Sequence, residues 1–148
     1  MIKTDIQIHQ PPPELRLNEK QYRMLCRDVL DELKLSAHSC AVIFVEDAFL
    51  SEMHQRYLSD PSETDVITFN LGEEAAEGEI YISKDRVEAQ AKQYGTSAEE
   101  EIIRLIIHGL LHLKGYDDID EQDRLAMKKE ENRLTGKYVK RLGPFGRP

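Results

Sequence analysis

Apolar residues recur along the chain at spacings that predict alternating strands and helices. Residues 2–8 alternate weakly and predict a strand, which the prolines at 11–13 end because proline has no N–H to donate to a sheet. The run CAVIFV at residues 40–45 is β-branched and aromatic, which predicts a short buried strand. Residues 64–71 and 78–83, TDVITFNL and GEIYIS, predict two more strands. A short acidic turn joins them, so we expect them to pair antiparallel.

A helical period of 3.6 residues predicts five helices around these strands. Asn18 with Gln21 three residues later resembles a capping box, the signature of a helix start. By similar signals the other helices are expected to begin at Asp47, Ser83, Ser97 and near Asp120. The expected ends are Gly95 and Gly115 for the third and fourth helices, and about Leu134 for the last, with Gly136 after it.

This order of elements predicts an α+β fold in a single domain, residues 1–148. We expect a mixed sheet of about four strands packed with about five helices. The fourth helix is apolar on most sides between Ile102 and Leu113, which predicts a buried central helix. A basic tail, about residues 136–148, has a composition that allows disorder.

Length and composition restrict the class of protein. A chain of 148 residues can bury roughly 70% of the surface that it exposes when unfolded, so it needs no disulfide. Cys26 and Cys40 lie in apolar surroundings and are expected to be reduced core residues. The first 13 residues carry charges and lack a long apolar stretch, which argues against a signal peptide or membrane span. We therefore expect a cytoplasmic protein.

Charge is distributed unevenly along the chain. The net charge of −8 argues against a protein that coats nucleic acid through its whole surface. From Arg124 onward, however, basic residues exceed acidic ones by six, which leaves −14 for the rest. This basic segment is either a solvated helix face with a frayed end or a surface that contacts phosphates. The sequence does not separate these two interpretations.

The segment HGLLHLKGYDD, residues 108–118, indicates a metal site. His108 and His112 are four residues apart and so share one face of a helix, and Gly115 lets the chain turn back so that Asp118 can close a third side. Three protein ligands that leave a position for water are typical of a catalytic metal. The alternative is two core histidines bonded to backbone groups. His54, by contrast, is expected to be a half-buried packing residue.

Gly109 distinguishes this site from a zinc protease. The spacing overlaps the protease pattern H-E-x-x-H-x-x-G-x-x-H, but Gly109 stands where the protease carries its general base. Glycine costs a helix about 1 kcal/mol relative to alanine, so a glycine here suggests that something approaches the backbone closely. A ligand or a tightly packed strand would serve equally well.

HGLLHLKGYDD resembles the signature H-G-x-L-H-L-x-G-Y-D-H of the YbeY family, bacterial single-metal endoribonucleases of rRNA maturation associated with the small ribosomal subunit. Residues 64–69, TDVITF, are similar to the family's T-D-V-L-S-F strand, and residues 78–80, GEI, to its G-[DE]-I strand. The motifs occur in the family's order and cover about residues 40–120.

The resemblance implies that His108 and His112 are zinc ligands and that the third ligand is residue 118. The family has histidine there and this chain has Asp118, so the site approaches the 2-His-1-carboxylate type that also suits Fe²⁺ or Mn²⁺. The family's arginine and proline before the Thr-Asp pair are replaced by Leu58 and Glu63. Arg56 is a candidate to replace that arginine from a different face.

The resemblance further implies a metal-dependent endoribonuclease, directed at single strands, that acts on ribosomal RNA with the small subunit as partner and without DNA or membrane. The alternative is a ribosome-associated RNA-binding factor whose metal only holds the fold. Cationic groups that could bind the phosphates of the substrate are Arg56, Lys114, Arg104 and the basic C-terminal helix. Each of them could equally lie on a solvated face without binding anything. Asp117 and Asp65 are candidates to orient a ligand, although Asp117 could simply cap the last helix.

The third ligand provides a test. Asp118→Asn removes a charge at nearly constant shape and should substantially weaken divalent-ion binding, because a carboxylate ligand binds as the anion. Asp118→His should restore binding with a stronger preference for zinc. Titration with Zn²⁺ and Mn²⁺ measures both. Unchanged affinity in Asp118→Asn would place Asp118 outside the ligand set and leave the third position to Asp117 or water.

Overall fold

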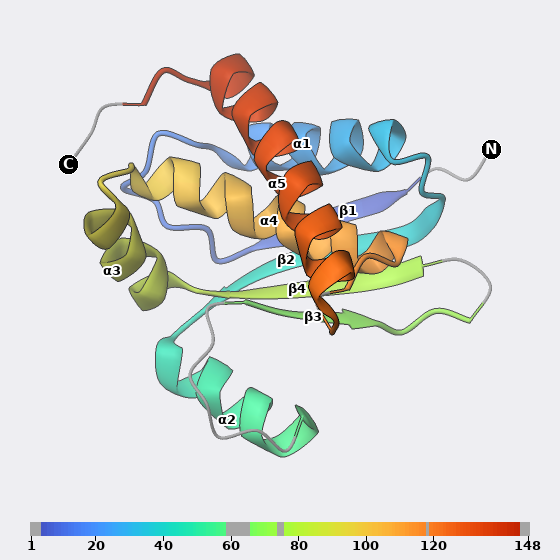
Figure 1. The fold of residues 1–148 in the computed structure, drawn as a ribbon. Coiled ribbons are helices and arrows are strands. Elements are labelled where there is room, and N and C mark those ends of the chain that lie inside the picture. The colour runs from blue at the N-terminus through green and yellow to red at the C-terminus, as the bar shows by residue number, and fades with distance from the viewer. Residues whose placement is uncertain (1–3, 59–65, 74–75, 118, 146–148) are drawn as a thin grey trace.

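The computed structural model describes residues 4–58, 66–73, 76–117 and 119–145, which form a four-stranded sheet and five helices (Figure 1). The strands are β1 (Asp5–His9), β2 (Ala37–Val45), β3 (Val66–Asn70) and β4 (Ala76–Ser83), in the sheet order β1-β2-β4-β3. β1, β2 and β4 are parallel, whereas β3 pairs antiparallel with β4 at the edge. The predicted α+β class and the predicted antiparallel pair are confirmed.

The helices are α1 (Glu19–Glu32), α2 (Asp47–Leu58), α3 (Lys84–Tyr94), α4 (Ala98–Lys114) and α5 (Glu121–Leu142). Four of them begin at the predicted caps: the side chains of Asn18, Ser83, Ser97 and Asp120 each accept a backbone N–H three residues later. Gly95 and Gly115 end α3 and α4 with φ of 68° and 117°, a conformation that favours glycine.

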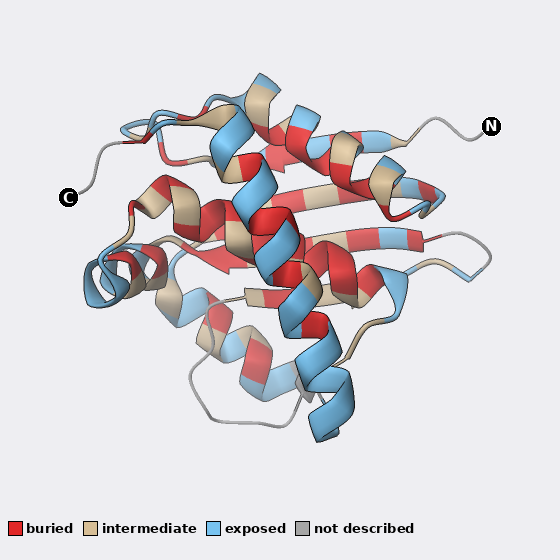
Figure 2. Ribbon diagram, turned by 45° about the horizontal axis from the view of Figure 1, so that its top comes forward, coloured by how far each residue is buried: buried red, intermediate tan, exposed pale blue. Residues whose placement is uncertain are grey.

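The helices cover the sheet unevenly. α1 and α4 lie on one face, α5 crosses over α4 as an outer layer, and α2 lies beyond the β3 edge on the side away from α1 (Figure 1). The covered face carries the buried strand residues, among them Val42, Phe44 and Ile80. The Tyr22 ring of α1 packs on Phe44 with centroids 5.6 Å apart. Figure 2 shows the buried residues concentrated between the sheet and these helices.

α4 is the central helix that the sequence predicts. It packs against β3 and β4 on one side and against α1, α3 and α5 on the others. Between residues 101 and 113 every residue is buried except Arg104, His108 and His112, which are partly exposed. These three positions are four residues apart, so they form a single stripe along one side of the helix. The fold thus leaves one polar stripe of α4 accessible.

Close packing between α4 and β4 explains Gly109. A Cβ atom at this position would lie 2.8 Å from Ile80 Cδ1 and 3.0 Å from Ile80 Cγ1, closer than carbon atoms pack. Gly78 on β4 makes the reciprocal contact, since a Cβ there would lie 2.4 Å from Leu113 Cδ1. Of the two explanations that the sequence left open for Gly109, the structure shows the tightly packed strand.

The end of α5 differs from the prediction. The helix does not stop at about Leu134 but continues through Gly136 to Leu142, so residues 136–142 are helical turns and not a disordered tail. Tertiary packing outweighs the low helix propensity of glycine here, because Tyr138 is 2% exposed in the core. Lys137 and Arg141 also pair with Glu32 and Asp28 of α1, which holds the last turns of α5 against that helix.

Two further expectations concern the class of protein. Cys26 and Cys40 are both fully buried free thiols, as the sequence predicts. Across the described ranges, the structure contains no helix with the length and apolar character needed to cross a membrane.

The two helical glycines allow a matched test of the packing argument. Gly109→Ala should lower the free energy of unfolding by about 1–3 kcal/mol, because the added methyl group forces Ile80 to move in a packed core. Gly136→Ala meets no atom within 4 Å and should raise it by up to about 1 kcal/mol. Urea denaturation of both variants compares them. Equal stabilisation by both substitutions would contradict the close contact at Gly109.

Candidate metal centre and adjoining cleft

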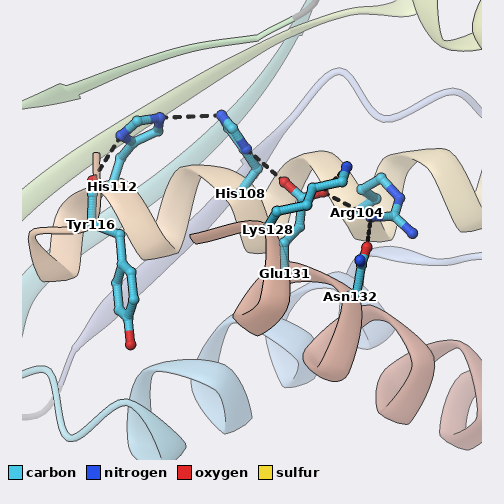
Figure 3. A network of polar contacts seen from close by, with 7 residues as sticks. All are labelled: Arg104, His108, His112, Tyr116, Lys128, Glu131 and Asn132. Atoms are coloured by element: carbon cyan, nitrogen blue, oxygen red, sulfur yellow. Dashed lines mark hydrogen bonds and ion pairs between the residues drawn. The ribbon is translucent and has the colours of Figure 1, made fainter. Parts of the chain in front are cut away.

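The two histidines of α4 point at each other. His108 Nε2 and His112 Nε2 are 3.1 Å apart, with the ring planes at 78° (Figure 3). The other nitrogen of each ring faces an oxygen: His108 Nδ1 lies 2.7 Å from Glu131 Oε1, and His112 Nδ1 lies 3.0 Å from the Tyr116 carbonyl. The helical spacing brings the rings together, and two different elements fix their orientation.

These contacts determine where the ring protons lie. A carbonyl and a carboxylate can only accept hydrogen bonds, so each Nδ1 carries the proton and donates it. In the neutral imidazoles both Nε2 atoms then present lone pairs to one another, an arrangement that needs a proton or a cation between them. Two nitrogens bound to one tetrahedral Zn²⁺ at its usual distance are about 3.3 Å apart. The donor atoms therefore fit a shared divalent ion.

Glu131 is the hub of the polar contacts around His108. Its side chain is 6% exposed and accepts hydrogen bonds from His108 (2.7 Å), Arg104 Nη1 (2.7 Å) and Lys128 Nζ (3.0 Å). Burial raises the pKa of Glu131, but these three hydrogen bonds outweigh it and lower the pKa to about 2. Its contribution to stability is thus complete above its ordinary pKa and is lost as the pH falls toward 2.

Sequence reasoning did not select Glu131, although a signal was present. It occupies a core position of α5, four residues after the buried Met127 and three before the buried Leu134. A carboxylate in the apolar stripe of a helix requires buried partners, because an unpaired charge there is costly. Two of its three partners, Arg104 and His108, are on α4, which packs against α5. That adjacency is visible only in the folded chain.

Asp117 does not bond either histidine among the described contacts but stabilises the turn before α5. Its carboxylate Oδ1 accepts the backbone N–H of Ile119 at 3.2 Å, in the turn before α5. The imidazole N–H groups bind Glu131 and the Tyr116 carbonyl instead. From the sequence, Asp117 and Asp65 are candidates to orient a ligand histidine or the water, and for Asp117 the role toward the water stays a prediction. Asp65 lies outside the described residues.

Of the remaining predicted site residues, the structure describes the side chains of Arg56 and Lys114. Arg56 lies exposed on α2 and pairs with Glu52 at 3.1 Å. Lys114 is exposed at the end of α4, and two positions beyond His112 is about 200° around a helix, so it leaves on another side. Asp118 lies outside the described residues, and within those residues no group of three metal-binding side chains occurs. Position 58 is described for its backbone only.

His54 behaves as expected for a packing residue on α2, since it is 9% exposed. Three cations of the basic C-terminal segment are paired with acidic residues within the protein. Arg133 pairs with Glu130 and Glu32, and Lys137 and Arg141 pair with acidic residues of α1. These ion pairs hold α5 against α1. The three paired cations are therefore less available to contact phosphates.

A cleft of about 540 Å³ adjoins the histidine pair. Its walls come from α3, the start of β3, α4 and α5, and they include His108, Arg104, Lys128 and Glu131. A second hollow of about 330 Å³, which shares His108, Lys128 and Glu131, is also lined by Arg124 and Leu125. His108 thus lies at the boundary of two spaces that a substrate can enter.

Comparison with known proteins identifies the family. A family model described as Endoribonuclease YbeY matches residues 6–139. The chain belongs to this family. The YbeY endoribonuclease of Caldicellulosiruptor saccharolyticus is 32% identical over 143 residues, which cover 84% of this chain and 90% of that protein. The one from Flavobacterium psychrophilum is 44% identical over 101 residues, which cover 66% and 71%.

The fold is also similar to that of a solved structure. A solution structure of a protein from Thermotoga maritima is similar with a TM-score of 0.68 and 26% identity, covering 92% of this chain and 90% of that one. The resemblance inferred from HGLLHLKGYDD and the two strand motifs is confirmed. Membership in the YbeY family makes this chain one of a family of endoribonucleases, enzymes that cleave RNA.

Glu131 provides a test of the site's architecture. Glu131→Gln keeps the shape but loses the charge that holds the His108 N–H, and loss of such a partner should weaken divalent-ion binding by about 10–100-fold. The matched control is Glu130→Gln, because Glu130 bonds Arg133 and not the histidine. Zn²⁺ titration against a chromogenic chelator measures both. Equal affinities in the two variants would show that Glu131 does not support the histidine pair.

Proposed function

We propose that this protein is a metal-dependent endoribonuclease that cleaves single-stranded segments of ribosomal RNA during maturation of the ribosome. The observation that supports the metal is the pair of facing Nε2 atoms, 3.1 Å apart, with both Nδ1 protons engaged elsewhere. Membership in a family of endoribonucleases supports RNA as the substrate. The ribosomal target, the small subunit as partner and a cytoplasmic location rest on the resemblance of the sequence motifs.

The proposed ligands are His108, His112 and Asp118, holding one ion per chain. Zn²⁺ suits this set, and the carboxylate at position 118 makes Fe²⁺ or Mn²⁺ suitable as well. When bound, a divalent ion polarises a phosphoryl oxygen or lowers the pKa of its water toward about 7, either of which promotes cleavage of a phosphodiester. Imidazole binds a metal only in its neutral form, and the Nδ1 contacts described above select the tautomer whose Nε2 is available to the ion.

The other residues act on orientation and charge. Glu131 holds the His108 ring so that Nε2 faces His112, and the Tyr116 carbonyl does the same for His112. Arg104 bonds Glu131 and Asn132 through Nη1, which leaves Nε and Nη2 without partners among the described residues. Those N–H groups and the half-exposed Lys128 can bind a phosphate beside His108. Arg56 and Lys114 stay predictions from the sequence.

The ion's role in cleavage can be tested with the histidines. His108→Ala and His112→Ala should lower cleavage of a single-stranded rRNA fragment by about 100-fold or more, since each removes an ion ligand. The double variant should lose stoichiometric metal. The control is His38→Ala, because His38 is an exposed histidine of β2. Cleavage rates with and without chelator, together with metal analysis by mass spectrometry, check the prediction.

Two other results would point to other functions. Full RNase activity in His108→Ala, in protein free of contaminating nuclease, would place the chemistry elsewhere. If chelation lowers the melting temperature but the wild-type protein binds RNA without cleaving it, the metal serves the fold and the protein is an RNA-binding factor.

A further inference from the structure

The cleft beside His108 has a composition that the cleavage step alone does not explain. Its far wall, on α3 and the loop after it, carries Gln90, Tyr94 and Thr96, and its near wall carries His108. Its volume of about 540 Å³ lies in the range typical of pockets for small organic ligands, about 300–1,000 Å³. There is room beyond the histidine pair for a group of the substrate that does not react.

Tyr94 is the aromatic residue of this cleft. It is the last residue of α3, and its side chain is largely exposed, with a relative exposure of 65%. Within the described ranges it has no ring partner and no hydrogen-bond partner. An exposed tyrosine ring at a cleft offers a flat apolar face on which a nucleobase can stack.

Two side-chain amides accompany Tyr94. Gln90 precedes it by one helical turn, so both lie on the same side of α3, and its amide has no partner among the described residues. Asn132 stands on α5, where its Oδ1 accepts a hydrogen bond from Arg104 at 2.9 Å, which leaves Nδ2 free to donate. Amides in this arrangement can form hydrogen bonds with the edge of a base.

The charge of the cleft favours a neutral group over a phosphate. Arg104 and Lys128 supply two positive charges, and the buried carboxylates Glu101 and Glu131 supply two negative ones. Both cations bond Glu131, next to His108. A phosphate is therefore best placed at the His108 end, and the Tyr94 end suits an uncharged base.

We propose that the cleft binds the base of the nucleotide that flanks the cleaved phosphate. Tyr94 stacks on that base, and Gln90 and Asn132 donate to or accept from its edge. A base can enter only when it is unpaired and unstacked, so the cleft selects single-stranded RNA. The inference rests on the proposed function, because it places the reacting phosphate at the histidine pair.

Kinetics of Tyr94 variants on a short single-stranded RNA test the stacking. Tyr94→Ala should raise KM by about 5- to 100-fold, which is the effect of losing one base–aromatic stack. Its kcat should stay within about twofold of the wild-type value. Tyr94→Phe keeps the ring and should match the wild type. The control is Phe49→Ala, because Phe49 is a comparably exposed aromatic on α2, with a relative exposure of 52%, outside the cleft. Circular dichroism verifies that each variant is folded.

An RNA with a single abasic nucleotide identifies the base. When the abasic site lies beside the cleaved bond, it should raise the KM of the wild-type protein by the same factor as Tyr94→Ala does on the intact RNA. Tyr94→Ala should then raise KM little further on the abasic RNA, because both changes remove the same stack. Gln90→Ala should reduce differences in rate among RNAs that vary only at this base. Wild-type KM in Tyr94→Ala, or independent effects of the abasic site and Tyr94→Ala, would overturn the proposal.

Equilibrium binding separates this inference from the proposed function. If the wild-type protein cleaves no RNA, the proposed function fails. Fluorescence anisotropy with the same RNA then still reports on the cleft, since Tyr94→Ala should weaken binding and Phe49→Ala should not. Cleavage that depends on His108 but is insensitive to Tyr94 would leave the function standing and reject the base subsite.

Discussion

The hydrogen bond of 2.7 Å between Glu131 and His108 connects the parts of this structure on which a metal site depends. It joins α5 to α4, fixes which nitrogen of His108 carries the proton, and turns Nε2 toward His112. The same carboxylate anchors Arg104 and Lys128 at the edge of the cleft. One acidic residue thereby orients a proposed ligand and holds two cations beside it.

This hydrogen bond requires that the carboxylate of Glu131 keep its charge although the side chain is buried. Burial alone raises the pKa of Glu131 and would favour a neutral acid, which could not accept from three donors. The three donors reverse this and keep the charge at neutral pH. The arrangement is also asymmetric in energy, because removal of one donor leaves a buried carboxylate with fewer hydrogen bonds.

The position of α4 is the second constraint. Gly109 and Gly78 let α4 lie close on β4, with Ile80 and Leu113 filling the space where their side chains would be. The apolar sides of the helix are then covered by the sheet, α1, α3 and α5, which leaves the stripe of Arg104, His108 and His112 partly exposed. Arg104 and His108 of this stripe line the cleft. Helix packing and the polar contacts of Glu131 therefore support the same geometry.

The sequence by itself determined the fold class, the order of elements, the helix starts at Asn18, Ser83, Ser97 and Asp120, and the pairing of His108 with His112. These depend on local rules of capping, periodicity and helical spacing, which act over a few residues. Only the tertiary structure decided that α5 continues past Gly136, that Ile80 explains Gly109, and that Glu131 and not Asp117 meets His108. Each of these depends on contacts between residues distant in sequence, whose free energies outweigh local preferences and cannot be assigned before the elements are placed in space.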